Sequence, residues 1–267
     1  MKPPQTGITL TSTTDPKAID YYVIINSPPA GEHYVPERTI VLQMEPWVLD
    51  PTKNWGVKTW GEWATPDPSK FFKVFTHKTD LNNVQWQIDF PFYTQPVLNG
   101  EKQNKVATIC SAKNFDQGHL LRNAFIKDTG LMIDVYGREN YHHFPSYKDV
   151  VPADNKYNVY AKYKYCLGVE NNWEKNYATE KIWEPILCES LCFYWGCPNL
   201  EDYLDAKAFV RLPLEDPAAA LQIIQQAIAE DWWSQRLPII KQMKEKILNE
   251  LGFFPRMAQA LKNGSGA

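Results

Sequence analysis

The sequence predicts an α/β fold built on parallel sheets. Short apolar runs that end in polar or turn-forming residues are typical of buried strands in such sheets. The clearest unit has a strand at 165–169, a polar loop at 170–172, a helix that begins after Thr179 and a second strand at 191–195, closed by Gly196. A strand, loop, helix and strand in this order is the repeating unit of a parallel sheet.

Composition limits the class of protein. The chain has 267 residues, of which 44% are hydrophobic, enough for one large domain or two small ones. A formal net charge of −3 argues against nucleic acid as the main partner. The sequence contains no apolar run of 18 residues and no signal peptide, so we expect no membrane span and a soluble chain. An anionic ligand would therefore need a local positive pocket.

The first half of the chain contains two clear strands, at 21–26 and 39–44. Glu45 follows the second strand, and Pro46 biases it toward extended geometry. Ligands of α/β folds bind at the carboxyl ends of the strands, so Glu45 is a candidate cleft residue. An exposed loop acid is the common alternative.

Four tryptophans follow in a segment rich in Gly, Pro and Lys: Trp47, Trp55, Trp60 and Trp63. One interpretation is a platform for an acceptor sugar, because an indole offers a flat apolar face beside a polar N–H group. The other is a local minicore under a long loop. We expect one or two of the four to contact the acceptor.

Two more strands, at 71–76 and 86–92, complete the first half, and 93–103 forms a linker with its boundary near Gly100. The predicted division is an α/β domain at 1–100, a second α/β domain at 101–235, and carboxyl-terminal helices with a tail at 236–267.

A strand at 105–110 opens the second domain, and a helix follows from an N-cap at Asp116 to about residue 129. The apolar residues of this helix recur at helical spacing: Leu120, Leu121, Ala124 and Phe125. Arg122 lies among them, and a solvent-facing side chain is the default for such an arginine. A strand at 132–136 and a polar connection at 148–163 come next.

The helix that begins after Thr179 offers an anion site. Unpaired backbone N–H groups give a helix start a partial positive charge, and Lys181 adds a full charge beside them. Other polar side chains fall at the carboxyl end of the preceding strand or in the first helical turn: Glu170, Asn171, Tyr177 and Glu180. A capped helix with a solvated Glu-Lys pair stays open as the alternative.

The sequence favours neither a metal site nor a disulfide framework. Its five cysteines lack the paired spacing of a zinc site, and at least three fall in apolar runs. His142 and His143 are adjacent and point apart, and no carboxylate or cysteine stands at ligand spacing from them.

Four stretches of the second half resemble the donor-binding signature of the α-1,3-fucosyltransferases. They are Val-Glu-Asn at 169–171, Asn-Tyr-Ala-Thr-Glu-Lys-Ile-Trp at 176–183, Phe-Tyr-Trp-Gly-Cys-Pro at 193–198 and Ala-Phe-Val at 208–210. Arg-Asn-Ala-Phe at 122–125 is a further match. The resemblance extends over most of the chain, and its central motif is specific.

Two apolar positions depart from the family pattern. Val169 stands where an aromatic residue is common, and Ala178 where Val or Ile is common. Neither change alters a polar group, so both affect packing and leave the reaction class intact.

The resemblance implies an inverting glycosyltransferase that moves L-fucose from GDP-fucose to a hydroxyl of a glycan acceptor, with no metal or other cofactor. It also implies the GT-B arrangement, in which two Rossmann-like domains face each other across a cleft. We expect the amino-terminal domain to be reduced or truncated, since relatives begin with an additional strand and helix. Another GDP-deoxysugar donor, or a non-catalytic carbohydrate-binding relative, stays open.

The resemblance also assigns roles. Glu45 stands where the family places its catalytic base, and Arg122 where an arginine reaches the donor diphosphate, which a guanidinium can bind with two parallel bonds. The other donor-binding residues implied are Glu170, Asn171, Tyr177, Thr179, Glu180 and Lys181. The acceptor-binding residues expected are Trp47, Trp55, Trp60 and Trp63.

Three helices are predicted at the carboxyl end, at 218–235, 237–251 and 253–262. The two-domain arrangement implies that a carboxyl-terminal helix crosses back to brace the first domain. Four apolar residues are candidates for that contact: Trp232, Trp233, Ile239 and Ile240. The compartment stays open. The cytoplasm is favoured for a soluble chain, and the Golgi lumen is the alternative if an anchor precedes it.

Overall fold

The computed structural model describes residues 15–45, 61–80, 101–130, 132–152 and 155–264. Trp47, Trp55, Trp60, the strand expected at 86–92 and the boundary expected near Gly100 lie outside the described residues. Within the described residues the fold is α/β with two parallel sheets, as predicted.

The larger sheet belongs to the second half of the chain. Its six parallel strands are β4 (Gln103–Ile109), β5 (Ile133–Gly137), β6 (Tyr147–Val150), β7 (Tyr163–Val169), β8 (Leu191–Trp195) and β9 (Phe209–Arg211). They lie in the order β6-β5-β4-β7-β8-β9. Numbered from β4 this is 3-2-1-4-5-6, the order of the Rossmann fold. The order reverses between β4 and β7, and ligands of such sheets bind at this switch point.

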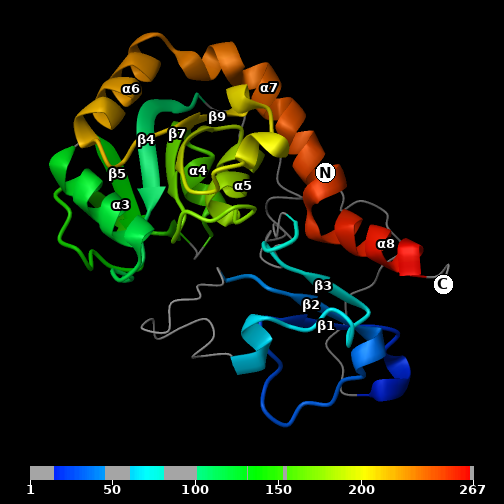
Figure 1. The fold of residues 1–267 in the computed structure, drawn as a ribbon. Helices are drawn as coiled ribbons and strands as arrows, with labels where there is room; N and C mark the ends of the chain where they lie inside the picture. The colour runs from blue at the N-terminus through cyan, green and yellow to red at the C-terminus, as the bar shows by residue number, and fades with distance from the viewer. Residues whose placement is uncertain (1–14, 46–60, 81–100, 131, 153–154, 265–267) are drawn as a thin grey trace.

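Five helices accompany this sheet: α3 (Gln117–Asp128), α4 (Tyr157–Tyr160), α5 (Glu180–Leu187), α6 (Pro217–Ala229) and α7 (Trp232–Lys246). All residues of β8 are buried, as expected for a central parallel strand that is covered on both faces. Figure 1 shows α6 and α7 as an arch beyond the sheet on the side away from the smaller sheet, while the arrowhead of β4 points toward the smaller sheet. The carboxyl ends of the central strands therefore face the first half of the chain.

The smaller sheet has three parallel strands, β1 (Tyr22–Ile25), β2 (Thr39–Leu42) and β3 (Lys73–Phe75), in that order. Every residue of the central strand β2 is buried. The connection from β1 to β2 contains only a 3-10 turn, Pro36–Arg38. The two parallel units, with their strand ends facing, form the GT-B arrangement that the resemblance implies.

Helix α8 (Phe253–Gly264) braces the smaller sheet, which confirms the expected crossing of the chain. Phe253 and Met257 share one buried apolar cluster with residues of β2 and β3. Arg256 Nη2 lies 2.7 Å from Asp80 Oδ2, just beyond β3. The prediction of which residues make this contact was wrong, because Trp232, Trp233, Ile239 and Ile240 pack against the core of the larger sheet.

The helix boundaries after residue 217 also differ from prediction. A break was expected before Pro238, but α6 ends at Ala229 and α7 continues through Pro238. The break occurs at Asp231, whose φ of 50° is left-handed. A left-handed residue stops a helix, whereas α7 accommodates Pro238 at its seventh position, where proline cannot donate a backbone hydrogen bond. A π-helical turn, Ile247–Leu251, then joins α7 to α8.

The segment at 148–163 contains more structure than its polar composition predicted, namely β6 and α4. All five cysteines are buried and free in the structure. No helix in the described part of the chain combines the length and apolarity needed to cross a membrane.

Candidate active site

A cavity of about 840 Å³ lies at the switch point, between the two sheets. Pockets of a few hundred to a thousand cubic ångströms suit ligands of nucleotide size. The larger unit contributes the residues that follow β4, β5 and β7 and the starts of α3 and α5. The smaller unit contributes Ile25, Asn26, Met44 and Glu45. The cavity therefore needs both halves of the chain.

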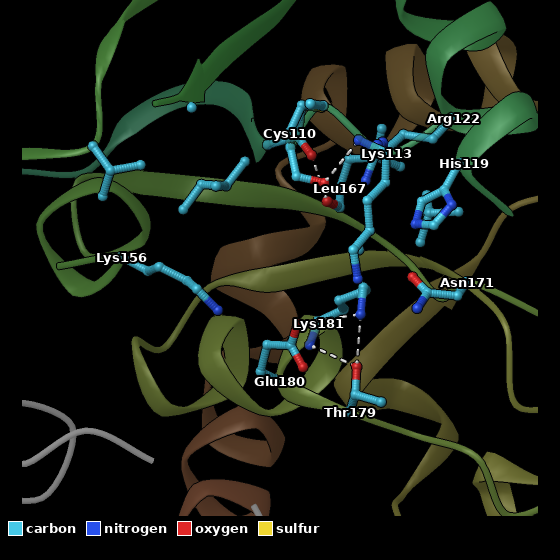
Figure 2. Close-up of a pocket in the computed structure, with 18 of the residues that line it drawn as sticks. Cys110, Lys113, His119, Arg122, Lys156, Leu167, Asn171, Thr179, Glu180 and Lys181 are labelled. Atoms are coloured by element: carbon cyan, nitrogen blue, oxygen red, sulfur yellow. Dashed lines mark hydrogen bonds and ion pairs between the residues drawn. The ribbon is translucent and has the colours of Figure 1, made fainter. Parts of the chain in front are cut away.

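The wall from the larger unit is basic. Its cationic side chains are Lys113, Arg122, Arg138, Lys156 and Lys181, and the carboxylates that line the cavity are Glu45 and Glu180. Figure 2 shows Lys113, Arg122 and His119 on one side of the space and Thr179, Glu180 and Lys181 on the other, at the start of α5. A chain of net charge −3 thus concentrates positive charge at one place, as an anionic ligand requires.

The start of α5 is capped as predicted, and it places the cation Lys181 at the cavity. Thr179 is the N-cap, in extended conformation, and its side chain accepts a bond from the backbone N–H of Lys181. Lys181 Nζ lies 3.1 Å from Thr179 Oγ1, 3.2 Å from Glu180 Oε1 and 3.4 Å from Glu170 Oε2. Burial alone would lower the pKa of Lys181, but Glu180 and Glu170 outweigh it and hold the pKa above its ordinary value. The lysine is therefore a cation at neutral pH.

Glu170 was predicted to bind the donor, and the structure places it behind the site instead. Its side chain is fully buried and does not line the cavity. Its Oε1 accepts bonds from Thr179 N at 2.8 Å and Tyr194 OH at 3.2 Å, and its Oε2 from Thr179 Oγ1 at 2.6 Å. Glu170 thus holds the start of α5 in place without lining the cavity. The sequence could not separate this role from ligand contact, since both need a carboxylate at the end of β7.

Helix α3 presents a polar face to the cavity. Arg122, only 5% exposed, lines the cavity beside His119, so the solvent-facing alternative for this arginine is wrong. The predicted apolar stripe is wrong in part, because Leu120 and Ala124 point to solvent. Polar side chains stand on the buried face of α3 where the helix borders the cavity. They interrupt the hydrophobic periodicity that normally marks the buried face of a helix.

His119 is a neutral donor or acceptor at this wall. Burial, and then the nearby cations Arg122 and Lys181, lower its pKa to about 3. Its Nδ1 lies 3.3 Å from the backbone N of Asp116. In the neutral ring one nitrogen accepts and the other carries the proton. Because Nδ1 accepts from Asp116, the proton lies on Nε2.

Gly118 lets α3 approach the end of β7 closely. Its N–H donates to Asn171 O at 2.9 Å, and a Cβ added at this position would lie 1.7 Å from Glu170 O. No side chain fits there. Glycine at this position therefore sets the distance between Arg122 on α3 and Asn171 on the loop after β7, both of which line the cavity.

Glu45 lies where the sequence predicted it, at the end of β2 and facing the cavity. Asn26 holds the backbone here: its Oδ1 accepts from Met44 N at 2.7 Å and from Glu45 N at 3.3 Å. Burial raises the pKa of the Glu45 carboxyl, and Lys113 and Lys181 oppose part of that rise. The carboxylate of the smaller unit thus lies within electrostatic reach of the basic wall of the larger unit.

Comparison with known proteins identifies the larger unit. Residues 99–226 match the family described as "Glycosyltransferase family 10 (fucosyltransferase) C-term". The larger unit belongs to the family 10 fucosyltransferases. The family 10 region thus includes β4 to β9 together with every cationic residue of the basic wall.

Several curated relatives carry the name "GDP-fucose protein O-fucosyltransferase 3". The zebrafish (Danio rerio) protein is 27% identical over 145 residues, which are 47% of this chain and 32% of that protein. The human protein is 38% identical over 52 residues, 20% of this chain and 11% of that protein. The matched regions thus span a third or less of these relatives.

Solved structures are similar at a lower level. An α1,3-fucosyltransferase with GDP-fucose covers 81% of this chain and 65% of its own, at 16% identity and a TM-score of 0.43. A glycosyltransferase from Rickettsia africae covers 86% and 63%, at 10% identity and a TM-score of 0.48. Overlaps this weak say nothing about the reaction.

Of the predicted site residues in the family 10 domain, the cavity brings together Arg122, Asn171, Tyr177, Thr179, Glu180 and Lys181. Trp63 of the smaller unit lies elsewhere. Its ring packs on Tyr34 at 5.9 Å and on Phe71 at 5.5 Å between centroids, and it does not line the cavity. This position matches the alternative of a local minicore.

The polar and charged lining residues that the sequence interpretation did not select include Asn26, Lys113, His119, Arg138 and Lys156. Lys113 follows β4, so the rule that selected Glu45 at the end of β2 would also have selected it. Lys156 lies in the segment that was predicted to be a connection. Its Nζ is 3.1 Å from Glu184 Oε1. Among the described residues, no group of three or more His, Cys, Asp and Glu side chains is placed to hold a metal ion.

Proposed function

We propose that this protein transfers L-fucose from GDP-fucose to a hydroxyl of an acceptor, with inversion at the anomeric carbon. The observation that carries this proposal is the pairing of one carboxylate, Glu45, with the basic wall of the family 10 domain across a single cavity. Such a pairing suits a reaction that removes a proton at one end and releases an anion at the other.

The donor diphosphate belongs at the basic wall. Arg122 on α3 and Lys113 after β4 approach it from one side, and Lys181 at the start of α5 approaches it from the opposite side. Arginine can bond phosphate oxygens in pairs, and a helix start stabilises negative charge. Glu180 is proposed to bond hydroxyl groups of the sugar or the ribose, and Asn171 and Tyr177 to order the phosphates.

In the proposed reaction the acceptor oxygen forms a bond to the anomeric carbon as its proton passes to a Glu45 carboxylate oxygen. The bond from that carbon to the diphosphate oxygen breaks with its electron pair, and GDP leaves. Arg122 and Lys181 stabilise the negative charge that grows on this oxygen, a role that metal ions have in other transferases. We therefore propose that the reaction needs no metal.

The first test is that GDP stabilises the protein without added metal. A ligand that binds only the folded state raises the unfolding free energy by about 2.7 kcal/mol at a hundredfold excess over Kd. Thermal unfolding with GDP in EDTA should therefore show a clear rise in Tm. No rise, or a rise that requires Mn²⁺, would contradict the metal-free diphosphate site.

Arg122→Ala should weaken GDP binding and slow transfer. A hydrogen bond to a charged group contributes about 1.5–3 kcal/mol, which corresponds to about a 10- to 100-fold loss of affinity. Lys181→Ala should have a similar effect on binding. It should also lower stability, because Lys181 lies beside the buried Glu170 carboxylate. Titration of GDP by calorimetry measures the effect on affinity.

The matched control for Arg122→Ala is Lys127→Ala, which removes an exposed cation from the same helix. Its GDP affinity should equal that of the parent. If Arg122→Ala also binds GDP like the parent, Arg122 does not contact the diphosphate.

The acceptor has two candidates. The resemblance implies a glycan hydroxyl, with Trp47, Trp55 and Trp60 proposed to contact the sugar. The relatives named protein O-fucosyltransferase favour a hydroxyl on a protein. A screen of glycan and protein acceptors, monitored by GDP release, separates the two. Hydrolysis of several GDP-sugars in parallel tests whether fucose is the donor sugar.

A further inference from the structure

A contact between the two units lies next to the donor-binding loop. Residues 76–80 follow β3 of the smaller sheet, and residues 174–177 precede the N-cap of α5 in the larger unit. Three interactions join these segments. They are a hydrogen bond between Asn176 and His77, an aromatic contact between His77 and Tyr177, and an ion pair between Lys78 and Glu174.

Asn176 is the centre of this contact. Its φ of 62° is left-handed, a conformation that Asn adopts more readily than most residues. Its Nδ2 donates to the backbone oxygen of His77 at 3.2 Å. Within its own unit, Asn176 Oδ1 accepts from Asn199 Nδ2 at 2.8 Å and from Tyr203 OH at 2.7 Å. Asn176 is buried, so these bonds are shielded from water.

The His77 ring lies against Tyr177, which lines the cavity. The ring centroids are 5.8 Å apart at 71°, an edge-to-face contact. His77 is buried, and this burial, followed by the charge of Lys78, lowers its pKa to about 4. At neutral pH the ring is therefore uncharged and packs as an aromatic group.

The ion pair and the nearby α8 complete the arrangement. Lys78 Nζ lies 3.8 Å from Glu174 Oε2, and both side chains are partly exposed, so this pair contributes little. Asp80, in the same segment as His77, pairs with Arg256 of α8. Residues 76–80 thus join the brace of the smaller sheet to the donor loop.

We propose that Asn176 and His77 are positioning residues for the donor site, through which the smaller unit fixes the place of Tyr177. The smaller unit then has two roles: it supplies Glu45, and it influences the donor affinity of a site whose basic groups, among the described residues, lie in the other unit. This inference rests on the proposed function, because it assigns Tyr177 to the GDP-sugar.

Asn176→Asp tests the contact between the units. Aspartate tolerates the left-handed backbone and keeps an acceptor for Asn199 and Tyr203, but it loses the donor to His77. Losing a neutral hydrogen bond and the ring position that it fixes should raise the Kd for GDP about five- to tenfold. The KM for the donor should rise in parallel, while kcat at saturating donor should stay close to that of the parent, because Glu45 is untouched.

A double-mutant cycle with Tyr177→Phe shows whether the effect passes through Tyr177. Effects of residues that act through one another are not additive. In the Tyr177→Phe background, Asn176→Asp should therefore change the Kd much less than it does in the parent. His77→Ala removes the ring contact without adding a charge, and it serves as the second variant if Asn176→Asp does not fold. Lys78→Gln is the matched control and should bind GDP like the parent.

Two results would overturn the inference. One is an Asn176→Asp or His77→Ala variant that is folded by circular dichroism and binds GDP as tightly as the parent. The other is full additivity with Tyr177→Phe, which would make the effect a general loss of stability. If the parent protein does not bind GDP, the proposed function is contradicted and the inference fails with it. This outcome differs from the other two results, in which the parent binds GDP.

Discussion

Glu45→Gln is expected to lower the rate of fucose transfer by about 10²–10⁴-fold, the usual effect of removing a general base. Glutamine keeps the size of the side chain and most of its hydrogen bonding, but it cannot accept the proton. GDP affinity should hardly change, because the proposed diphosphate site lies in the other unit. Transfer and GDP titration, measured on the same preparation, separate these two effects.

The pH dependence gives a second measure of the same group. Burial raises the pKa of Glu45, and a general base works only when it is deprotonated. Activity should therefore rise with pH through a midpoint above the ordinary value for a glutamate. This rise should be absent in Glu45→Gln. Glu32→Gln, an exposed acid between β1 and β2, is the control and should keep both the rate and the profile.

A Glu45→Gln variant that folds normally and transfers fucose near the parent rate would contradict the assignment. The proton would then pass to another acid, and the next to test would be Asp50 and Glu62, in the tryptophan-rich segment.

Gly118→Ala is expected to be destabilising and to abolish tight GDP binding. In an ordinary helical position Ala is more stable than Gly by about 0.5–1 kcal/mol. At Gly118 the added Cβ would lie 1.7 Å from the backbone oxygen of Glu170, so α3 or the loop after β7 must shift. Overpacking of this kind typically costs about 1–3 kcal/mol. Chemical denaturation measures whether the substitution lowers the free energy of unfolding, as expected, or raises it.

The reverse substitution on the same helix is the control. Ala124→Gly is at an exposed position and should be mildly destabilising through helix propensity alone, with GDP binding retained. If Gly118→Ala is instead stabilising and binds GDP normally, the close approach of α3 to Glu170 does not set the geometry of the cavity.

The sequence predicted the central strands well because their patterns are local. The run at 191–195 coincides with β8, and Thr179 is the N-cap that was expected. The prediction failed for α3, because the buried face of this helix contains the polar residues His119, Arg122 and Asn123. Their hydrogen-bond partners are polar residues close by in the sequence, Asp116 for His119, Asn123 for Arg122 and Asn114 for Asn123, so a hydrophobic pattern does not report their burial.

The site was predictable to the extent that strand ends and helix starts are recognisable. Glu45, Arg122 and Lys181, which that rule and the resemblance selected, line the cavity. Glu170 was not, because a carboxylate that supports a helix start and one that binds a ligand occupy the same place in the sequence. The role of Trp63 could not be predicted for a similar reason, because a tryptophan suits both apolar burial against Tyr34 and contact with a sugar.

The brace made by α8 has a consequence for the order in which the chain folds. Ile40, Leu42 and Phe75 bury their side chains against Phe253 and Met257, near the other end of the sequence. During synthesis, which proceeds from the amino terminus, the smaller sheet emerges from the ribosome long before the helix that covers it. The core of the larger unit, which includes Ile240 and Ile247, lies before α8 in the sequence and can therefore form before the brace. The smaller sheet must therefore keep apolar surface exposed until α8 has been synthesised, and exposed apolar surface makes a partly folded chain prone to aggregation.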